Sequence, residues 1–229
     1  MPLSREQELA ATIALAAGAG DLSLAGGSAL IVHGLIDRTT KDIDAFTRSL
    51  RADIDQIADR VAAALQAADY SVRDVSVSAM RRLQVSRQRR GPLGRKPDEV
   101  QIEIGLDYQA LPALPSRLGP ILDPRELAAN KILAIYDRNR ARDADDLARL
   151  VAVLSWKQVL EVANLKQVEP MDPALLAESL RRFRLIRDAE FPFPQHAPSV
   201  KEYMNHLADC VEAGGPPTVT GPYGEPRQE

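Results

Sequence analysis

The chain has 229 residues, enough for one large domain or two small ones, and its composition of 45% hydrophobic and 27% charged residues is typical of a soluble globular protein. The formal net charge of −3 argues against a generally basic nucleic-acid binder, and the single cysteine, Cys210, excludes a disulfide framework or a cysteine-rich zinc site. No apolar run approaches the roughly 20 residues that span a bilayer and no secretion signal is present, so we expect a cytoplasmic protein with no membrane partner.

The chain begins with a helix and a short strand that lead into a glycine turn. Ser4 and Gln7 have the spacing of a capping box, and the Ala/Leu-rich helix they start continues to about Ala17. A strand around 22–24 then runs into Gly26-Gly27-Ser28. Because a helix start has free N–H groups, Gly26, Gly27 and Ser28 could hold the phosphates of a nucleotide, with the Ser28 hydroxyl as an additional donor.

The next motif is a strand that carries two carboxylates. Asp42 and Asp44 are two residues apart, so on a strand both side chains point to one face. Two adjacent negative charges are unfavourable unless a cation lies between them, and carboxylate oxygens suit Mg²⁺, which completes its shell with water and nucleotide phosphates. We therefore predict that Asp42 and Asp44 are metal ligands. The alternative is a solvated strand end.

The middle of the chain predicts a helix and a hairpin. Residues 52–68 have helical periodicity, residues 72–77 favour one or two strands, and 80–85 and 99–106 read as paired strands joined by a basic, turn-rich loop. In the second strand, apolar residues alternate with polar ones. Glu103 lies on that polar face and is the candidate third metal ligand, with Asp107 as the weaker substitute and an exposed strand Glu as the alternative.

The second half of the chain is predicted to be helical. Residues 111–124 are proline-rich and irregular, and a strong helix start at Asp123-Pro-Arg-Glu126 follows them. Further helices are expected over 143–154 and from Ser155, Met171 and Ser199, whereas residues 214–229 have too little apolar content to pack. We expect a catalytic core over 1–110, a helical domain over 120–213 and a flexible tail over 214–229.

Three segments together resemble the AbiEii/MenT type of toxin in the nucleotidyltransferase superfamily. They are GGSAL, RTTKDIDAF and ELAANKILAIYDRNRARDADDL, and the resemblance covers roughly residues 22–150. It implies an α/β (α+β) fold: a nucleotidyltransferase-type mixed sheet with helices, followed by a helical C-terminal domain. It also implies Mg²⁺, an NTP substrate and a catalytic role for Asp42 and Asp44.

The resemblance extends to the helical segment. Family members carry a lysine followed by Arg-Asp and a second Asp, which match Lys131, Arg142-Asp143 and Asp146 here. The implied role of Lys131 is to contact the triphosphate and neutralise charge on the leaving group. Asp143 and Asp146 share a helix face, and the pattern leaves open which of them serves the site; the alternative is an N-cap and a surface pair with Arg149.

The acceptor is predicted from the basic clusters and the family. Arginines and lysines gather at 81–96, 138–142 and 181–187, and such clusters in an otherwise acidic chain suggest contact with a phosphate backbone. The leading hypothesis is a toxin that transfers nucleotides to RNA, with the tRNA 3′ end as acceptor, and is neutralised by a cognate antitoxin. The alternatives are a nucleotidyltransferase acting on a protein or an aminoglycoside-like molecule, and a catalytically silent binding module.

Overall fold

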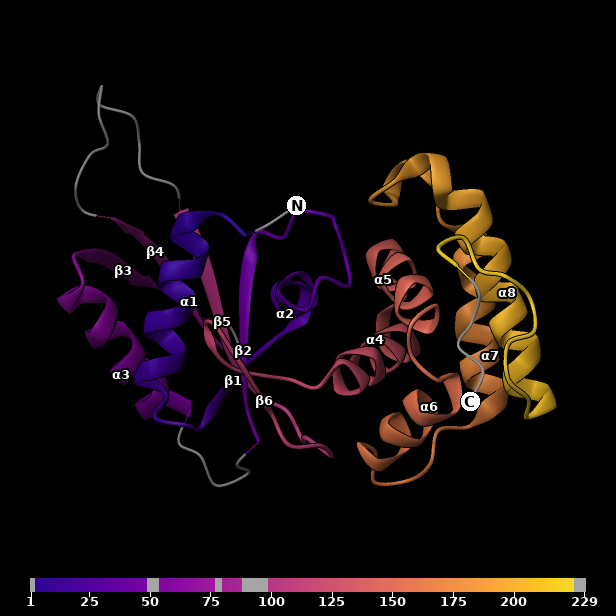
Figure 1. The fold of residues 1–229 in the computed structure, drawn as a ribbon, viewed down its shortest axis with the longest axis horizontal. Coiled ribbons are helices and arrows are strands. Elements are labelled where there is room, and N and C mark those ends of the chain that lie inside the picture. The colour runs from indigo at the N-terminus through magenta and orange to yellow at the C-terminus, as the bar shows by residue number, and fades with distance from the viewer. Residues whose placement is uncertain (1–2, 49–53, 77–79, 88–98, 225–229) are drawn as a thin grey trace. The chain divides into compact units, whose positions relative to one another are not determined.

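The computed structural model describes residues 3–48, 54–76, 80–87 and 99–224, and these form two compact units that meet in sequence at Asp123 and Pro124. The first unit holds the strands and the second is helical, which confirms the predicted α/β class (Figure 1). The boundary differs from the expected one near residue 110, because two further strands belong to the first unit. None of the helices in the described ranges combines the length and apolar character needed to cross a bilayer.

The first unit is a seven-stranded mixed sheet with the strand order β3-β4-β5-β2-β1-β7-β6. Its elements are α1 (Arg5–Ala17), β1 (Leu22–Ala25), α2 (Gly26–Val32), β2 (Asp42–Thr47), α3 (Ile54–Ala67), β3 (Tyr70–Asp74), β4 (Arg81–Arg87), β5 (Glu99–Leu106), β6 (Leu114–Ser116) and β7 (Gly119–Ile121). The capping box predicted for the first helix is present, since Ser4 and Gln7 exchange side-chain and backbone hydrogen bonds.

The alternating residues of the central strands give the sheet one apolar, buried face and one polar face. Ile43 and Ala45 of β2 are fully buried, as are Ile102 and Ile104 of the neighbouring parallel strand β5. Helices α1 and α3 pack together and cover this apolar face, while α2 lies on the opposite side of the sheet (Figure 1). The alternation therefore places the residues between these apolar positions on the face that α1 and α3 do not cover.

The prediction that residues 111–124 are irregular is wrong. Residues 114–121 form the short hairpin β6–β7, and Leu24 of β1 lies beside Ile121 in a parallel pair. A backbone hydrogen bond from Leu122 to the Leu24 carbonyl continues this pairing. Pro115 and Pro120 lie directly opposite each other, so neither has an N–H to donate at that step of the ladder.

The second unit consists of five helices with short 3₁₀ turns between α7 and α8. They are α4 (Pro124–Arg138), α5 (Ala141–Val151), α6 (Trp156–Leu165), α7 (Pro173–Arg181) and α8 (Ala197–Ala213). An ion pair is buried where α4 packs on α6: Lys166 Nζ lies 2.8 Å from Glu126 Oε2, and the two side chains are 1% and 0% exposed. A cavity of about 550 Å³ between α6, α7, α8 and residues 214–218 contains none of the predicted site residues.

The segment after α8 folds back onto the helical unit instead of forming the expected flexible tail. Gly214 ends α8 in the left-handed conformation, and the Thr218 N–H donates to the ring of His206. The Tyr223 hydroxyl donates to the buried carboxylate of Asp145, and the Arg149 guanidinium lies 3.8 Å over the Tyr223 ring. The correction applies to residues 214–224, since residues 225–229 lie outside the described ranges.

Candidate active site

The glycine turn and the second strand meet where Gly26 faces Asp44. Gly26 has a φ of +57°, which favours glycine. A Cβ placed on it would lie 1.8 Å from Oδ2 of Asp44, closer than any real contact. The Asp44 carboxylate therefore packs directly against the backbone of Gly26, and any residue with a Cβ at this position would clash with it.

Ser28 has a structural role that the sequence did not reveal. Its side chain is fully buried, and its Oγ donates a 2.7 Å hydrogen bond to the backbone carbonyl of Asp42. The hydroxyl proton predicted for phosphate binding is thus used to hold α2 against β2. The neighbouring Gly27 is also confined, because a Cβ there would lie 3.2 Å from Oγ1 of Thr40.

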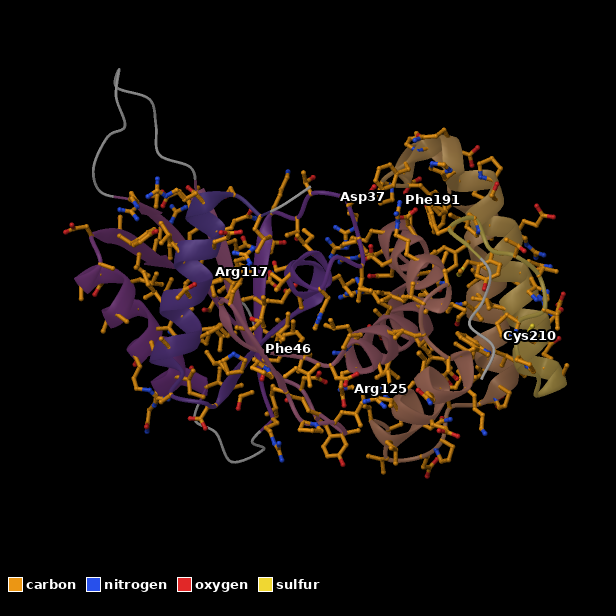
Figure 2. All side chains as sticks on the ribbon, viewed as in Figure 1. Asp37, Phe46, Arg117, Arg125, Phe191 and Cys210 are labelled. Carbon is orange, nitrogen blue, oxygen red and sulfur yellow. The ribbon has the colours of Figure 1, made fainter. Side chains whose placement is uncertain are left out.

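Asp42 and Asp44 lie as predicted on one face of β2. Both are partly exposed, whereas Ile43 and Ala45 between and after them are buried. Phe46, labelled in Figure 2, is the next residue on the same face. Adjacent carboxylates on a partly exposed strand fit a hard divalent cation such as Mg²⁺. The missing Cβ at Gly26 makes room for the Asp44 carboxylate itself.

Glu103 is beside these carboxylates but is held by other residues. It is the direct neighbour of Asp44 across the β2–β5 pair. Its Oε1 accepts hydrogen bonds from Arg82 Nε at 2.9 Å and Gln101 Nε2 at 3.0 Å, and Arg82 also approaches with its terminal nitrogen at 2.7 Å. Within the described ranges, no three His, Cys, Asp or Glu side chains come close enough together to ligate one ion.

The structure brings together three predicted residues of the helical unit. Lys131 on α4 lies between two carboxylates of α5, with Nζ 2.9 Å from Asp143 Oδ1 and 2.8 Å from Asp146 Oδ2. The lysine side chain is 11% exposed and the aspartates are 1% and 0% exposed. The sequence left open which aspartate is relevant, and both contact the lysine.

This cluster keeps Lys131 charged. Burial disfavours the ammonium form, but Asp146 and Asp143 outweigh it by attraction and hydrogen bonding, so the pKa of Lys131 is raised. Asp143 Oδ2 is buried and has no hydrogen-bond partner, although Arg138 Nε comes within 3.9 Å of it. The alternative of a surface pair between these aspartates and Arg149 is wrong, because Arg149 pairs with the buried Asp145 at 3.2 Å.

The three basic clusters differ in how much of their positive charge is already paired with acidic side chains. The described arginines of the first cluster are all paired with acids: Arg81 with Asp55, Asp59 and Asp74, Arg82 with Glu103, and Arg87 with Glu6. The rest of this cluster, residues 88–98, lies outside the described ranges. In the third, Arg181 pairs with Asp209 and Glu212, Arg182 with Glu178, and Arg187 with Glu190. Arg138, Arg140 and Arg142 are exposed around the start of α5.

Two residues of the carboxylate site escaped the sequence prediction. Gln101 shares the polar face of β5 with Glu103, and its Nε2 donates to Asp42 Oδ1 at 3.1 Å as well as to Glu103. The alternation that selected Glu103 also placed Gln101 on this face. Arg82 could be assigned only from the strand register, in which it lies opposite Glu103.

The architecture is that of a nucleotidyltransferase. It is similar to JHP933 from Helicobacter pylori, with 17% identity over 93% of this chain and 94% of that one and a TM-score of 0.57. It is also similar to MenT4, a nucleotidyltransferase toxin from Mycobacterium tuberculosis H37Rv, with 14% identity over 88% of this chain and 82% of that one and a TM-score of 0.60. At these identities the similarity concerns the fold alone.

The family is established by sequence. Residues 7–219 match the family model described as nucleotidyl transferase AbiEii toxin, type IV toxin–antitoxin system. This chain therefore belongs to the AbiEii nucleotidyltransferase toxin family. A search of curated proteins found no significant match.

Proposed function

We propose that this protein is a magnesium-dependent toxin that transfers nucleotides from an NTP to RNA, with the 3′ end of tRNA as the acceptor. The observation that carries the proposal is the pair Asp42 and Asp44, partly exposed on one strand face, with the backbone of Gly26 against the second carboxylate. A nucleotidyltransferase needs anionic ligands for its metal next to backbone that a triphosphate can approach. The family membership supports the same chemistry.

In this proposal Asp42 and Asp44 bind the metal ion, and one of them accepts the proton of the attacking hydroxyl. A bound Mg²⁺ stabilises charge on the attacking and leaving oxygens of an in-line displacement. In the same proposal, Gly26 and Gly27 let the triphosphate approach the backbone. Ser28 contributes indirectly, because its hydrogen bond to the Asp42 carbonyl fixes the strand that carries both carboxylates.

The role of Lys131 in binding the triphosphate remains part of the proposal. The raised pKa keeps the ammonium charged at any physiological pH, which a residue that neutralises a leaving group requires. Asp143 and Asp146 then act as positioning residues that hold the ammonium in place. Because both aspartates are buried, removing Lys131 would also destabilise the helical unit, so kinetics and stability have to be measured together.

RNA as the acceptor is supported by the exposed Arg138, Arg140 and Arg142. The ion pairs of the first and third clusters reduce the positive charge that they offer to a phosphate backbone. Protein and small-molecule acceptors are therefore included in the test. Purified protein is incubated with Mg²⁺, each labelled NTP in turn, and total tRNA, total cell protein or an aminoglycoside.

Label at RNA 3′ ends is the expected result. Label only on protein or on the aminoglycoside would identify the alternative nucleotidyltransferase. Nucleotide binding without transfer to any acceptor would identify a silent binding module. An Asp42→Asn/Asp44→Asn double variant serves as the negative control in every reaction.

An antitoxin partner is implied by the type IV description of the family. Thr39 is exposed and Thr40 is half-buried, with Oγ1 3.4 Å from the Asp42 carbonyl. A phosphate on either threonine would add about −1.5 to −2 charge near the two carboxylates and oppose triphosphate binding.

We include modification of Thr39 or Thr40 as a route to neutralisation. It is tested by the peptide masses of the toxin co-expressed with its neighbouring gene, where the absence of a phosphate on this segment in neutralised toxin counts against it.

A further inference from the structure

The polar face of the sheet is organised in rows that run across the strands. In one row Asp44, Glu103 and Arg82 are direct neighbours on β2, β5 and β4, and in the next row Asp42, Gln101 and Gln84 are neighbours. The row beyond is apolar: it pairs Phe46, which Figure 2 labels, with Gly105, on which a Cβ would lie 3.3 Å from the Phe46 ring. The carboxylates, one amide and one guanidinium thus share a confined area.

Hydrogen bonds join the two polar rows into one network. Arg82 donates to Glu103 Oε1 through Nε at 2.9 Å, and its terminal nitrogen lies 2.7 Å from the same oxygen. The Nε2 group of Gln101 donates both to this oxygen, at 3.0 Å, and to Asp42 Oδ1, at 3.1 Å. Glu103 is 16% exposed and Arg82 41%, so the contact is more shielded on the carboxylate side.

Each member of the network limits what the others can do. Oε1 of Glu103 already receives donors from two residues, and coordination of a metal through it would displace them. Gln101 cannot turn its amide without presenting its own oxygen to two carboxylates, because only the nitrogen side donates. The orientation of Asp42 is therefore coupled to Glu103, and through Glu103 to Arg82.

The charges lead to the same conclusion. Arg82 supplies the positive charge that pairs with Glu103, with its terminal nitrogen 2.7 Å from Glu103 Oε1. We propose that Arg82 is a built-in counter-cation that holds Glu103 out of the metal shell, while Gln101 positions Asp42, so that Asp42 and Asp44 alone bind the metal. This inference rests on the proposed function and replaces the predicted metal role of Glu103.

The test measures Mn²⁺ binding to the full chain by calorimetry, without nucleotide, together with the melting temperature in the absence of metal. Arg82→Met adds net negative charge, so it is expected to tighten Mn²⁺ binding roughly three- to tenfold while lowering the metal-free melting temperature. Gln101→Leu frees Asp42 to rotate and is expected to weaken binding roughly 10- to 100-fold. If Arg82→Met does not fold, Arg82→Lys keeps the charge and is expected to keep wild-type affinity.

The decisive variant is the double substitution Arg82→Met/Glu103→Gln. It removes one charge of each sign and retains Asp42 and Asp44, so Mn²⁺ affinity is expected within about threefold of the wild type. Arg73→Met is the matched control, because Arg73 lies on the same sheet face but donates to the neutral Gln84. It is expected to leave Mn²⁺ binding unchanged.

Three results would overturn the inference, and they can be told apart. If the double variant loses Mn²⁺ as completely as Asp44→Asn does, Glu103 is a ligand and the inference fails while the metal site stands. If Asp44→Asn binds Mn²⁺ like the wild type, the metal site of the proposed function is wrong and the inference falls with it. An Arg82→Met variant that behaves like Arg73→Met would also reject a counter-cation role.

Discussion

The backbone of Gly26 lies directly against the carboxylate of Asp44, so close that a Cβ would come within 1.8 Å of Oδ2. Gly26→Ala is therefore expected to displace Asp44 and abolish nucleotide transfer. Gly34→Ala is the matched control: Gly34 also has a positive φ, at 71°, but nothing lies within 4 Å of a Cβ there. Both variants carry backbone strain of about 1 kcal/mol, so only the clash distinguishes them. Equal activity of the two would reject the importance of this contact.

Removing either strand carboxylate is expected to abolish transfer and leave the fold intact. Asp42→Asn and Asp44→Asn each remove one charge of a like-charged pair, so the metal-free melting temperature is expected to be unchanged or slightly higher. Transfer to RNA and thermal unfolding are measured on the same preparations. Asp59→Asn serves as control, because that side chain is 76% exposed on α3. Near-normal turnover of both Asp42 and Asp44 variants with magnesium would show that the active site is elsewhere.

Lys131→Ala is expected to reduce the transfer rate on the order of 10²–10³-fold if the lysine stabilises transition-state charge. It also leaves Asp143 and Asp146 buried without their cation, at a cost of about 3–5 kcal/mol in unfolding free energy. Lys131→Arg keeps the charge but not the geometry, so we expect only partial rescue of the rate.

The two effects of Lys131 can be separated with a compensated variant. Lys131→Met combined with Asp143→Asn and Asp146→Asn removes all the charges of the cluster and is expected to regain much of the lost stability. Its transfer rate should stay low if Lys131 acts on the nucleotide. Recovery of transfer together with stability would mean that the cluster is structural.

Alkaline stability is expected to depend on Tyr203. Its buried hydroxyl has no hydrogen-bond partner, and burial raises the pKa to about 12 from the usual 10. A raised folded-state pKa means that this stability is intact below about pH 10 and is lost as the pH rises towards 12. The raised pKa of Lys131 has the same sign and also contributes in alkali.

Chemical denaturation across pH 8–12 checks this expectation. Tyr203→Phe removes the unpartnered hydroxyl, so it should raise the unfolding free energy by about 1 kcal/mol at neutral pH and reduce the alkaline loss. Tyr108→Phe is the control, because Tyr108 is 50% exposed. A Tyr203→Phe variant with the wild-type alkaline profile would contradict the assignment.

Contact with RNA is expected to make activity fall steeply with salt, through counterion release. Arg140→Gln/Arg142→Gln should raise the KM for RNA and flatten the salt dependence, with Mn²⁺ binding unchanged. Arg181→Gln/Arg187→Gln is the control, because those side chains are already paired with acids. A second test group consists of the residues of the predicted basic loop, Arg89, Arg90, Arg95 and Lys96. Wild-type salt dependence in both groups would argue for an acceptor other than RNA.

Short sequence patterns correctly predicted the elements that depend on residues close together in the chain. The alternation around Ile43 and Ile102 identified the central strands, and the capping box at Ser4 identified the first helix. The sequence did not reveal hairpin β6–β7, because its two strands are three residues long and contain proline, and because β7 pairs with β1, almost 100 residues earlier in the chain. The Arg82–Glu103 contact needs the register of two strands, which composition does not provide.

The return of residues 214–224 onto α5 bears on how the toxin is made. The buried carboxylate of Asp145 receives the Tyr223 hydroxyl, which is synthesised 78 residues later. During translation, α5 is complete long before this partner leaves the ribosome, so the helical unit cannot reach its final packing while it is still being made. The final packing around Asp145 would thus form only after the segment that carries Tyr223 has left the ribosome.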